Sequence, residues 1–457
     1  MNLSNKEKSV LDIIKNDKNA ENYFFKKVKD IKWFTILKQE GFFSVKNAPW
    51  PKLIDDNKWF IPEWNVLQYL EKISQQLKNI EEDKRYINDL LKIIQDVSKY
   101  TENGKHIDNY RTWYYFTKIL CNIPNEYINK EILKLVDIWL TSDFDTTLQD
   151  SEIVTKLFPK FLTDDKKDIK KAELIFKYIT APHKKFSQKK LSVDFYWLKE
   201  MLEKYSEVIG KKCSMKILNT LINHIKKLKL KEYTGTYYSF YDESKYDPSD
   251  SIGMLIHMIK VISPEMIKYK ANELCDFVKK LFELDEFLFH KIGLYIIGQD
   301  IDKFRKLFFE LLEPEKGVLI FSKTLYFGDE LKKVLENLKP LSNDEKELLK
   351  EKIEIASQKF KEDLKNDLTE DEKQRRALIH KQEIYGALSF DQEFKNLYEQ
   401  LKLKTGVDAI LHPAVRFNFA SWVGNKSPLS TEEILNRDNK DLVNYLKEFK
   451  GYNVWEE

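Results

Sequence analysis

Two residues of this 457-residue chain have the types and spacing of a catalytic pair: Arg375 and His380, at the ends of the hexapeptide RRALIH. An imidazole transfers protons near neutral pH, and a guanidinium holds a phosphate through paired hydrogen bonds. Together they could cleave the backbone of RNA, with histidine as the acid–base. The surrounding sequence, DEKQRRALIHKQE, equally fits a charged helix face on which both residues meet solvent or acidic neighbours.

The Arg-x4-His spacing of Arg375 and His380 resembles the motif of HEPN-type ribonucleases, which are all-helical proteins. The resemblance implies that the histidine acts as acid–base while the arginine holds the scissile phosphate. HEPN enzymes generally pair two such sites from two domains, and this sequence contains one. A HEPN-like ribonuclease is therefore an alternative function, and the charged helix face is the favoured interpretation.

Other catalytic signatures do not occur in the sequence. A P-loop needs GxxxxGK followed by Ser or Thr, and the nearest fragment, Gly210-Lys211, has Tyr205 where the first glycine should stand. No GxGxxG or GxSxG pattern is present, and the seven histidines form no HExxH or Cys–His grouping. Scattered ExK triplets are expected by chance in a chain this rich in Glu and Lys. We therefore expect a protein that is not an enzyme and that has no cofactor and no metal.

A basic segment spans residues 156–232, where 20 lysines and 9 acidic residues give a net charge of +11, against +3 for the whole chain. Lysines interleaved with aromatic residues are typical of non-specific nucleic-acid grooves. The candidate contacts are Lys184, Lys185, Lys189, Lys190, Lys226, Lys227, Lys229 and Lys231. The helical spacing of Phe195, Leu198 and Leu202 favours the alternative, in which the aromatic residues form the core and the lysines a solvated face.

The elements that must position these residues are predicted to be helices. The chain has only 13 glycines, and apolar residues recur every three to four positions along most of its length. Short connections between successive helices favour antiparallel pairs. The pattern predicts an all-α fold, an irregular α-solenoid of antiparallel helical hairpins of the HEAT or TPR type. We divide it into an N-terminal helical-repeat region (1–235), middle repeats (250–340) and a C-terminal helical region (341–457).

Several local features refine this picture. Residues 22–38 read as one amphipathic helix, Asn129 as the cap of a helix to residue 140, and Ser263-Pro264 as a helix start. Ser342 and Glu345 form a capping box. The run GVLIF, at 317–321, is either a brief strand or a buried loop. We expect irregular binding loops at 42–62, 231–251 and 412–430, because long loops in repeat arrays tend to carry function.

Composition indicates the cellular setting. The N-terminus has no hydrophobic signal core, and no stretch approaches the roughly 18 apolar residues of a membrane-spanning helix. Three widely spaced cysteines suggest buried thiols in a reducing compartment. We expect a cytoplasmic protein that does not bind membranes.

Four stretches resemble the helical-repeat region of large bacterial antiphage defence proteins of the STAND NTPase type. They are residues 22–51, 108–140, 379–402 and 426–450, beginning NYFFKKVKD, DNYRTWYYF, IHKQEIYGA and KSPLSTEEI. In that class a repeat array senses a phage component while a separate ATPase module drives assembly. The resemblance implies a sensor array that is either a fragment of a larger chain or a subunit in a complex with an ATPase.

The leading hypothesis is thus a non-enzymatic helical-repeat scaffold or sensor that binds a macromolecule, with a protein partner favoured, in bacterial antiphage defence. The first alternative is a nucleic-acid-binding helical protein that uses residues 156–232. The second is the HEPN-like ribonuclease.

Overall fold

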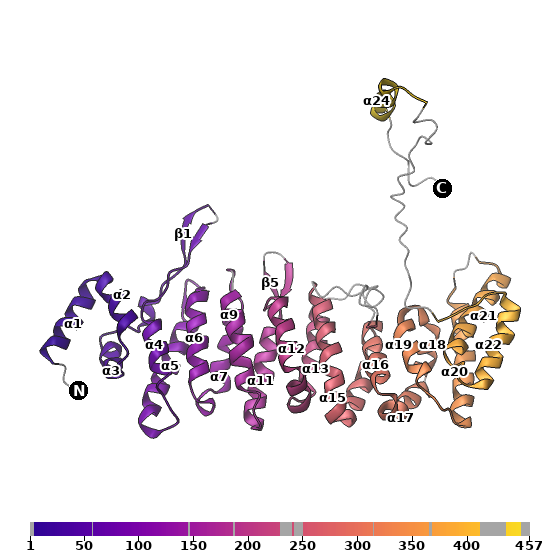
Figure 1. Ribbon diagram of the computed structural model, residues 1–457, viewed down its shortest axis with the longest axis horizontal. Coiled ribbons are helices and arrows are strands. Elements are labelled where there is room, and N and C mark those ends of the chain that lie inside the picture. Colours follow the sequence, from indigo (N-terminus) through magenta and orange to yellow (C-terminus); the bar gives the residue numbers. More distant parts are fainter. Residues whose placement is uncertain are drawn as a thin grey trace.

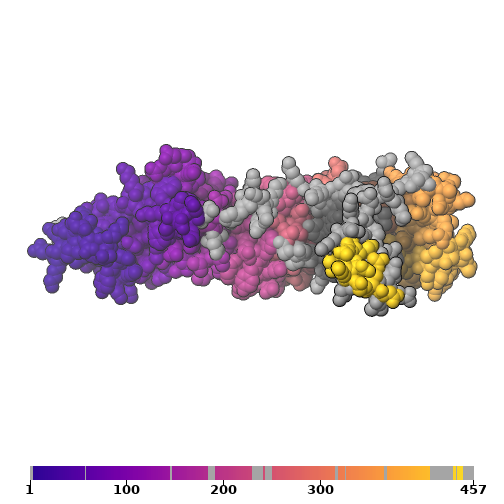
Figure 2. Space-filling model, turned by 90° about the horizontal axis from the view of Figure 1, so that it is seen from above, coloured from indigo at the N-terminus to yellow at the C-terminus, as the bar shows by residue number. Residues whose placement is uncertain are grey.

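The computed structural model describes residues 4–56, 58–144, 147–185, 188–228, 240–241, 250–313, 315–364, 368–411 and 436–448. Most of these residues are helical, and each sheet among them is a single two-stranded hairpin. The helices stand side by side in one long row from α1 to α22 (Figure 1), and the same order follows the long axis when the molecule is seen from above (Figure 2). The all-α prediction is confirmed. Within the described ranges, no helix has the length and apolar character needed to cross a membrane.

The first part of the row contains five helices, a 3-10 turn and a hairpin. These are α1 (Asn5–Asn16), α2 (Lys18–Lys27), α3 (Lys32–Gln39), η1 (Val45–Asn47), β1 (Lys52–Asp55), β2 (Lys58–Phe60), α4 (Leu67–Ser74) and α5 (Glu81–Lys99). The single helix predicted over 22–38 is wrong, because the chain leaves the helix after Lys27 and starts a new one at Lys32. The Asp30 carboxylate accepts the N–H of Lys32, the first residue of α3, at 3.0 Å. The 42–62 segment contains the β1–β2 hairpin rather than loop alone.

The middle of the row carries the basic segment. Its elements are β3 (Thr101–Glu102), β4 (Lys105–His106), α6 (Tyr110–Asn122), η2 (Asn125–Tyr127), α7 (Lys130–Leu133), α8 (Leu135–Trp139), α9 (Thr147–Glu152), η3 (Ile153–Leu157), α10 (Phe158–Lys160), α11 (Lys166–Ile179), β5 (Pro182–Lys185), β6 (Gln188–Leu191), α12 (Phe195–Lys212) and α13 (Lys216–Lys227). The predicted cap is confirmed, since Asn129 accepts the backbone N–H groups of Glu131 and Ile132. The helix that follows is split into α7 and α8 at Lys134.

The last part of the row contains longer helices. They are α15 (Ser251–Leu281), α16 (Phe287–Gln299), α17 (Ile301–Leu312), α18 (Glu315–Ser322), α19 (Thr324–Glu336), α20 (Asn343–Glu362), α21 (Glu370–Ala387) and α22 (Gln392–Thr405), and α24 (Asn439–Glu448) follows. The capping box of Ser342 and Glu345 is confirmed. The strand or loop predicted at 317–321 is wrong, because these residues lie inside α18. Of the predicted loops, 412–430 and most of 231–251 lie outside the described residues.

The helix start predicted at Ser263-Pro264 is also wrong, because α15 runs through both residues. Proline has no N–H, so the carbonyl four residues earlier, that of Lys260, loses its helical partner. The hydroxyl of Tyr295 on α16 donates to this carbonyl at 3.2 Å and replaces the missing bond. The irregular residue of α15 is instead Lys270 (φ −142°, ψ 36°), whose ammonium donates to the carbonyls of Gly210 and Lys211 at the end of α12.

One hydrophobic core runs along the row, from Leu11 in α1 to Leu411 after α22. In the aromatic helix α6, Trp113 and Phe116 are fully buried, and the ring of Trp113 stacks on Trp139 with centroids 6.1 Å apart. Most helices therefore bury one face against their neighbours and leave the opposite face for solvent or ligands, whereas α16 is buried on all sides from Leu288 to Gly298.

Candidate functional site

The predicted catalytic pair lies on α21, where His380 is buried. Its Nε2 lies 2.9 Å from the carbonyl oxygen of Phe321, so this nitrogen carries the proton and donates it. Its Nδ1 lies 3.3 Å from the Ser357 hydroxyl, and the ring stacks on Phe360 at 4.3 Å. Burial lowers the pKa of His380 to about 4, so the ring is neutral at pH 7. Both ring nitrogens are used inside the protein.

Arg375 is exposed, and its guanidinium donates to the carbonyl of Thr405 at 3.3 Å. Five residues on an α-helix turn the side-chain direction by about 140°, so Arg375 and His380 leave α21 from different faces. The structure does not bring the two side chains together around a common site. The packing accounts for both residues without catalysis.

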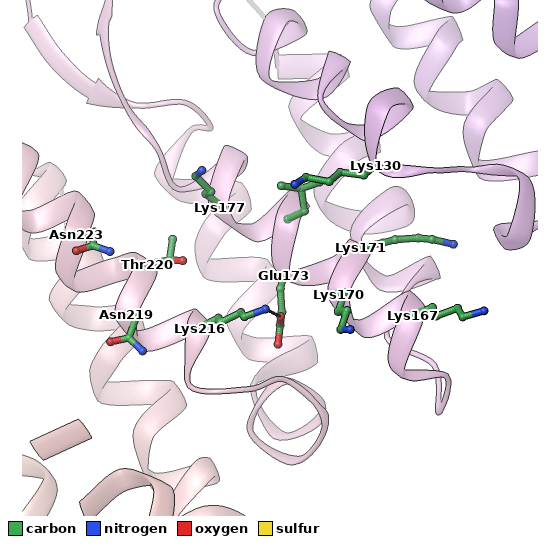
Figure 3. A pocket seen from close by; sticks show the side chains of 11 residues that line it. Lys130, Lys167, Lys170, Lys171, Glu173, Lys177, Lys216, Asn219, Thr220 and Asn223 are labelled. Atoms are coloured by element: carbon green, nitrogen blue, oxygen red, sulfur yellow. Dashed lines mark ion pairs between the residues drawn. The ribbon is translucent and has the colours of Figure 1, made fainter. Parts of the chain in front are cut away.

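The basic segment, in contrast, forms a groove of about 600 Å³ between α11 and α13, with α7 at its edge (Figure 3). We call it the lysine groove. Six of its eleven lining residues are lysines and one is acidic. The lining residues are Lys130, Lys167, Lys170, Lys171, Glu173, Leu174, Lys177, Lys216, Asn219, Thr220 and Asn223.

The wall on α11 carries most of the positive charge. Asp165 caps this helix by accepting the Lys167 N–H at 2.7 Å, and the inward face buries residues such as Ile175 and Phe176. Lys167, Lys170 and Lys177 lie at positions i, i+3 and i+10, which place them on one outward face. All three are exposed and, among the described residues, none has a carboxylate within ion-pair distance. Their charges are available to a ligand.

Lys130 and Lys171 also line the groove, in different states. Lys130 opens α7, is exposed, and has no ion pair within the part of the chain that the structure describes. The Lys171 ammonium is already used, because it donates to the Asn125 carbonyl at 2.7 Å and pairs with Asp168 at 3.0 Å. Four of the six lysines are therefore unpaired, and they are Lys130, Lys167, Lys170 and Lys177.

Glu173 is the one acidic lining residue, and it is held by a structural contact. Its Oε1 accepts hydrogen bonds from the backbone N–H and the hydroxyl of Ser214, at 2.8 and 2.6 Å. Its Oε2 lies 4.0 Å from the ammonium of Lys216 (Figure 3). This carboxylate ties α11 to the start of α13 and offsets Lys216 only weakly. The groove keeps a strongly positive field.

The wall on α13 is mostly neutral and polar. Asn219, Thr220 and Asn223 lie on its groove face, while residues such as Leu218 and Ile222 are buried behind them. The side-chain amide of Asn219 donates to the Met215 carbonyl at 3.0 Å. Nearby His224 is buried, and desolvation lowers its pKa to about 4, so it adds no charge at pH 7.

Of the lysines named from the sequence, those whose side chains are described, Lys226 and Lys227, do not line this groove. The β5–β6 hairpin follows α11 directly, and its register pairs Lys184 with Lys189 and His183 with Lys190. The side chains of Lys184, Lys185, Lys189 and Lys190, and all of Lys229 and Lys231, lie outside the described residues. Lys226 is exposed with its ammonium 5.5 Å from the Phe289 ring, and Lys227 is exposed.

The groove lies within the basic segment that the sequence indicated, but the predicted contacts did not include the groove lysines on α11. The signal was present, because Lys167, Lys170 and Lys177 repeat at helical spacing. Most of the described aromatic residues of this segment pack in or against the core, as the alternative interpretation predicted, and Phe176 and Tyr178 are buried. Tyr196 is the exception, with 64% of its surface exposed.

A second surface is the β1–β2 hairpin, which projects from the row of helices (Figure 1). Leu53, Ile54, Trp59 and Phe60 are each 50–69% exposed, and Leu53 pairs with Trp59 in the register. The only ring in contact with Trp59 among the described residues is Phe144, at 5.9 Å. Four large apolar side chains on one short hairpin are unusual for a surface without a partner.

No group of three or more His, Cys, Asp or Glu side chains that could hold a metal ion occurs among the described residues. Comparisons of the chain with protein-family models, with curated proteins and with solved structures found no match. The candidate function therefore depends on the chemistry of the two surfaces.

Proposed function

We propose that the protein is a non-enzymatic helical-repeat protein that binds nucleic acid, with the phosphates held in the lysine groove. The single observation that carries this proposal is the groove itself, with six lysines and one carboxylate that is already engaged by Ser214. The ordered row of helices supports an irregular α-solenoid of the HEAT or TPR type. In such an array a ligand lies along the surface that neighbouring helices share.

The charge arrangement sets the strength and salt dependence of binding. Each lysine that neutralises a phosphate releases condensed counterions, which gives a slope of about 0.7 for a single strand in a plot of log affinity against log salt. The four unpaired lysines then predict a slope of about 3. Affinity should fall about 50-fold between 50 and 200 mM salt.

A charge-neutralising variant tests this proposal. We expect Lys167→Gln, Lys170→Gln and Lys177→Gln together to weaken the binding of a fluorescent 20-nucleotide strand and to lower the salt slope by about 2. Fluorescence anisotropy at several salt concentrations measures both quantities.

The matched control removes the same charge elsewhere, from Lys280, Lys395 and Lys404 on α15 and α22, which are exposed and form no ion pair with any described residue. This control should bind almost as the parent protein does. Equal losses in the two triple variants, or no binding by the parent protein at 50 mM salt, would contradict the proposal.

A protein partner is the second candidate, and the exposed apolar β1–β2 hairpin favours it. In this proposal Trp59 and Phe60 supply the aromatic anchors that dominate most protein interfaces. The setting suggested by the sequence resemblance, a sensor in bacterial antiphage defence that works with an ATPase, stays a proposal as well. Capture from host lysate with and without nuclease treatment separates the candidates, because only a protein bound to the hairpin survives nuclease and is lost in the Trp59→Ser, Phe60→Ser variant.

The ribonuclease alternative has no structural observation in its favour. His380 would have to leave its contacts with Phe321 and Ser357 before it could reach a substrate. We expect RNA incubated with the protein to remain intact.

A further inference from the structure

The lysine groove has two chemically different walls, and this difference points to how a strand is oriented in it. The α11 wall offers the unpaired ammonium groups of Lys167, Lys170 and Lys177. The α13 wall offers two amides and a hydroxyl, from Asn219, Asn223 and Thr220. It also carries one ammonium group, that of Lys216 at the start of the helix, which lies 4.0 Å from the Glu173 carboxylate. Figure 3 shows the two sets of side chains on separate helices that border the same hollow.

We infer that the groove binds a single nucleic-acid strand, with its phosphates along α11 and its bases against α13; this inference rests on the proposed function. Ammonium groups bind phosphates as point charges and select no sequence. Amide groups can donate to and accept from the edge of an unpaired base. The α11 wall would thus supply most of the affinity, and the α13 wall would determine which bases are preferred.

The amides on α13 have hydrogen-bonding capacity to spare. The nitrogen of Asn219 donates to Met215, which leaves its carbonyl oxygen as an acceptor. The amide of Asn223 is exposed and makes no hydrogen bond within the described part of the chain. Four residues separate the two asparagines, about 6 Å along the helix, so they can contact one or two neighbouring bases.

The shape of the groove favours a single strand over a duplex. Helices α11 and α13 are packed neighbours, so their axes lie about 8–10 Å apart. Base edges in a duplex are read by elements that protrude into its grooves. The amides here line a groove between two helices and do not stand on an element that protrudes, an arrangement that suits a splayed base better than the base edges of a duplex. The three α11 lysines extend over about 15 Å, enough for two or three phosphates of an extended strand.

Among the described residues, no aromatic side chain lines the groove. The described lining therefore offers no ring on which a base could stack. Any base preference should come from the asparagines, and it should disappear when they are removed.

The test uses the full chain and four fluorescent probes at one fixed salt concentration: oligo(A), oligo(C) and oligo(U) as RNA, and a mixed-sequence duplex. The variant is Asn219→Ala with Asn223→Ala, which suits helical backbone because alanine is the best helix former. Asn396→Ala, at an exposed position of α22, is the control. DNA homopolymers with matching bases show whether ribose or deoxyribose is preferred.

We expect the parent protein to bind single strands more tightly than duplex and to differ among the homopolymers. The asparagine variant should bind the preferred homopolymer about 2- to 10-fold more weakly for each amide removed, with the salt slope unchanged. Equal affinity for duplex and strands, or unchanged homopolymer affinities in the variant, would overturn the inference while the proposed function stands. If the parent protein binds none of the probes, the proposed function itself is wrong.

Discussion

A buried ion pair between Lys291 on α16 and Glu330 on α19 should make the local stability of the protein depend on pH. The two side chains are 1% and 0% exposed, and Nζ lies 3.6 Å from Oε2. The other carboxylate oxygen of Glu330 accepts the Phe240 N–H at 2.9 Å. Desolvation outweighs both contacts and raises the pKa of Glu330 to about 7. We expect Glu330→Gln to remove the free-energy cost of burying an ionised carboxylate, a cost that depends on pH.

The direction follows from proton linkage. A carboxyl group whose pKa is higher in the folded than in the unfolded protein binds its proton more tightly when folded. The free energy of unfolding is then greatest at low pH and falls as the pH rises through the window between 4.5 and about 7. With about 1.4 kcal/mol for each pKa unit, Glu330 costs roughly 3 kcal/mol above pH 8 and about 1 kcal/mol at pH 5.

The assay compares Glu330→Gln with the parent protein by hydrogen–deuterium exchange of peptides from α16 and α19, because a long helical row need not unfold in one step. The stability of the variant relative to the parent should rise by about 2–3 kcal/mol from pH 5 to pH 8. Glu336→Gln, at an exposed position of α19, should show no such trend. If Glu330→Gln is instead less stable than the parent protein at pH 8, the attraction between Glu330 and Lys291 outweighs desolvation, and the reasoning is wrong.

Three further predictions concern the packing between helices. Tyr295→Phe should cost about 1 kcal/mol in urea unfolding, since it removes the hydrogen bond from the Tyr295 hydroxyl to the Lys260 carbonyl. Gly210→Ala should cost about 1–3 kcal/mol despite the better helix propensity of alanine, because the new Cβ would lie 2.5 Å from the Cβ of Glu265 on α15; a stabilised variant would refute this close approach. The parent protein should lose stability as the pH falls from 6.5 to about 4, because in this range His380 is neutral when folded and takes up a proton on unfolding. His380→Phe should lose less stability over the same range, which acid titration followed by circular dichroism measures.

Local sequence signals predicted the fold class and several helix ends correctly. The capping box at Ser342 and the cap at Asn129 depend only on residues within one turn, so the sequence contains all the information needed. The helix start at Pro264 failed for the opposite reason. Whether a proline ends a helix depends on a distant donor, here Tyr295, which no local pattern reveals. The short run at 317–321 could not be assigned by periodicity, because a brief apolar run fits a strand and a buried helix alike.

The candidate site, too, could be predicted only in part from local sequence signals. The net charge of 156–232 identified the basic segment, and the spacing of Lys167, Lys170 and Lys177 could have identified one helix face. The groove also needs Lys130 from α7 and the polar face of α13, and only the packing of α7 and α13 against α11 brings them together. That packing is a tertiary property. For the alternative pair Arg375 and His380, the spacing along the chain could not show that His380 is buried, because burial depends on the helices packed around it.

The composition of the groove limits what it can recognise. The segment 156–232 contains no arginine, so bidentate contacts to phosphate or guanine cannot come from it. Lysine attracts phosphate through charge alone, and such binding is sensitive to salt and nearly independent of sequence. Any preference of the groove for particular bases must then come from the polar side chains of α13, those of Asn219, Thr220 and Asn223. Four of the lining lysines lie on α11, whereas α13 contributes Lys216 beside the Glu173 carboxylate. This uneven distribution of charge favours one orientation of a strand across the width of the groove.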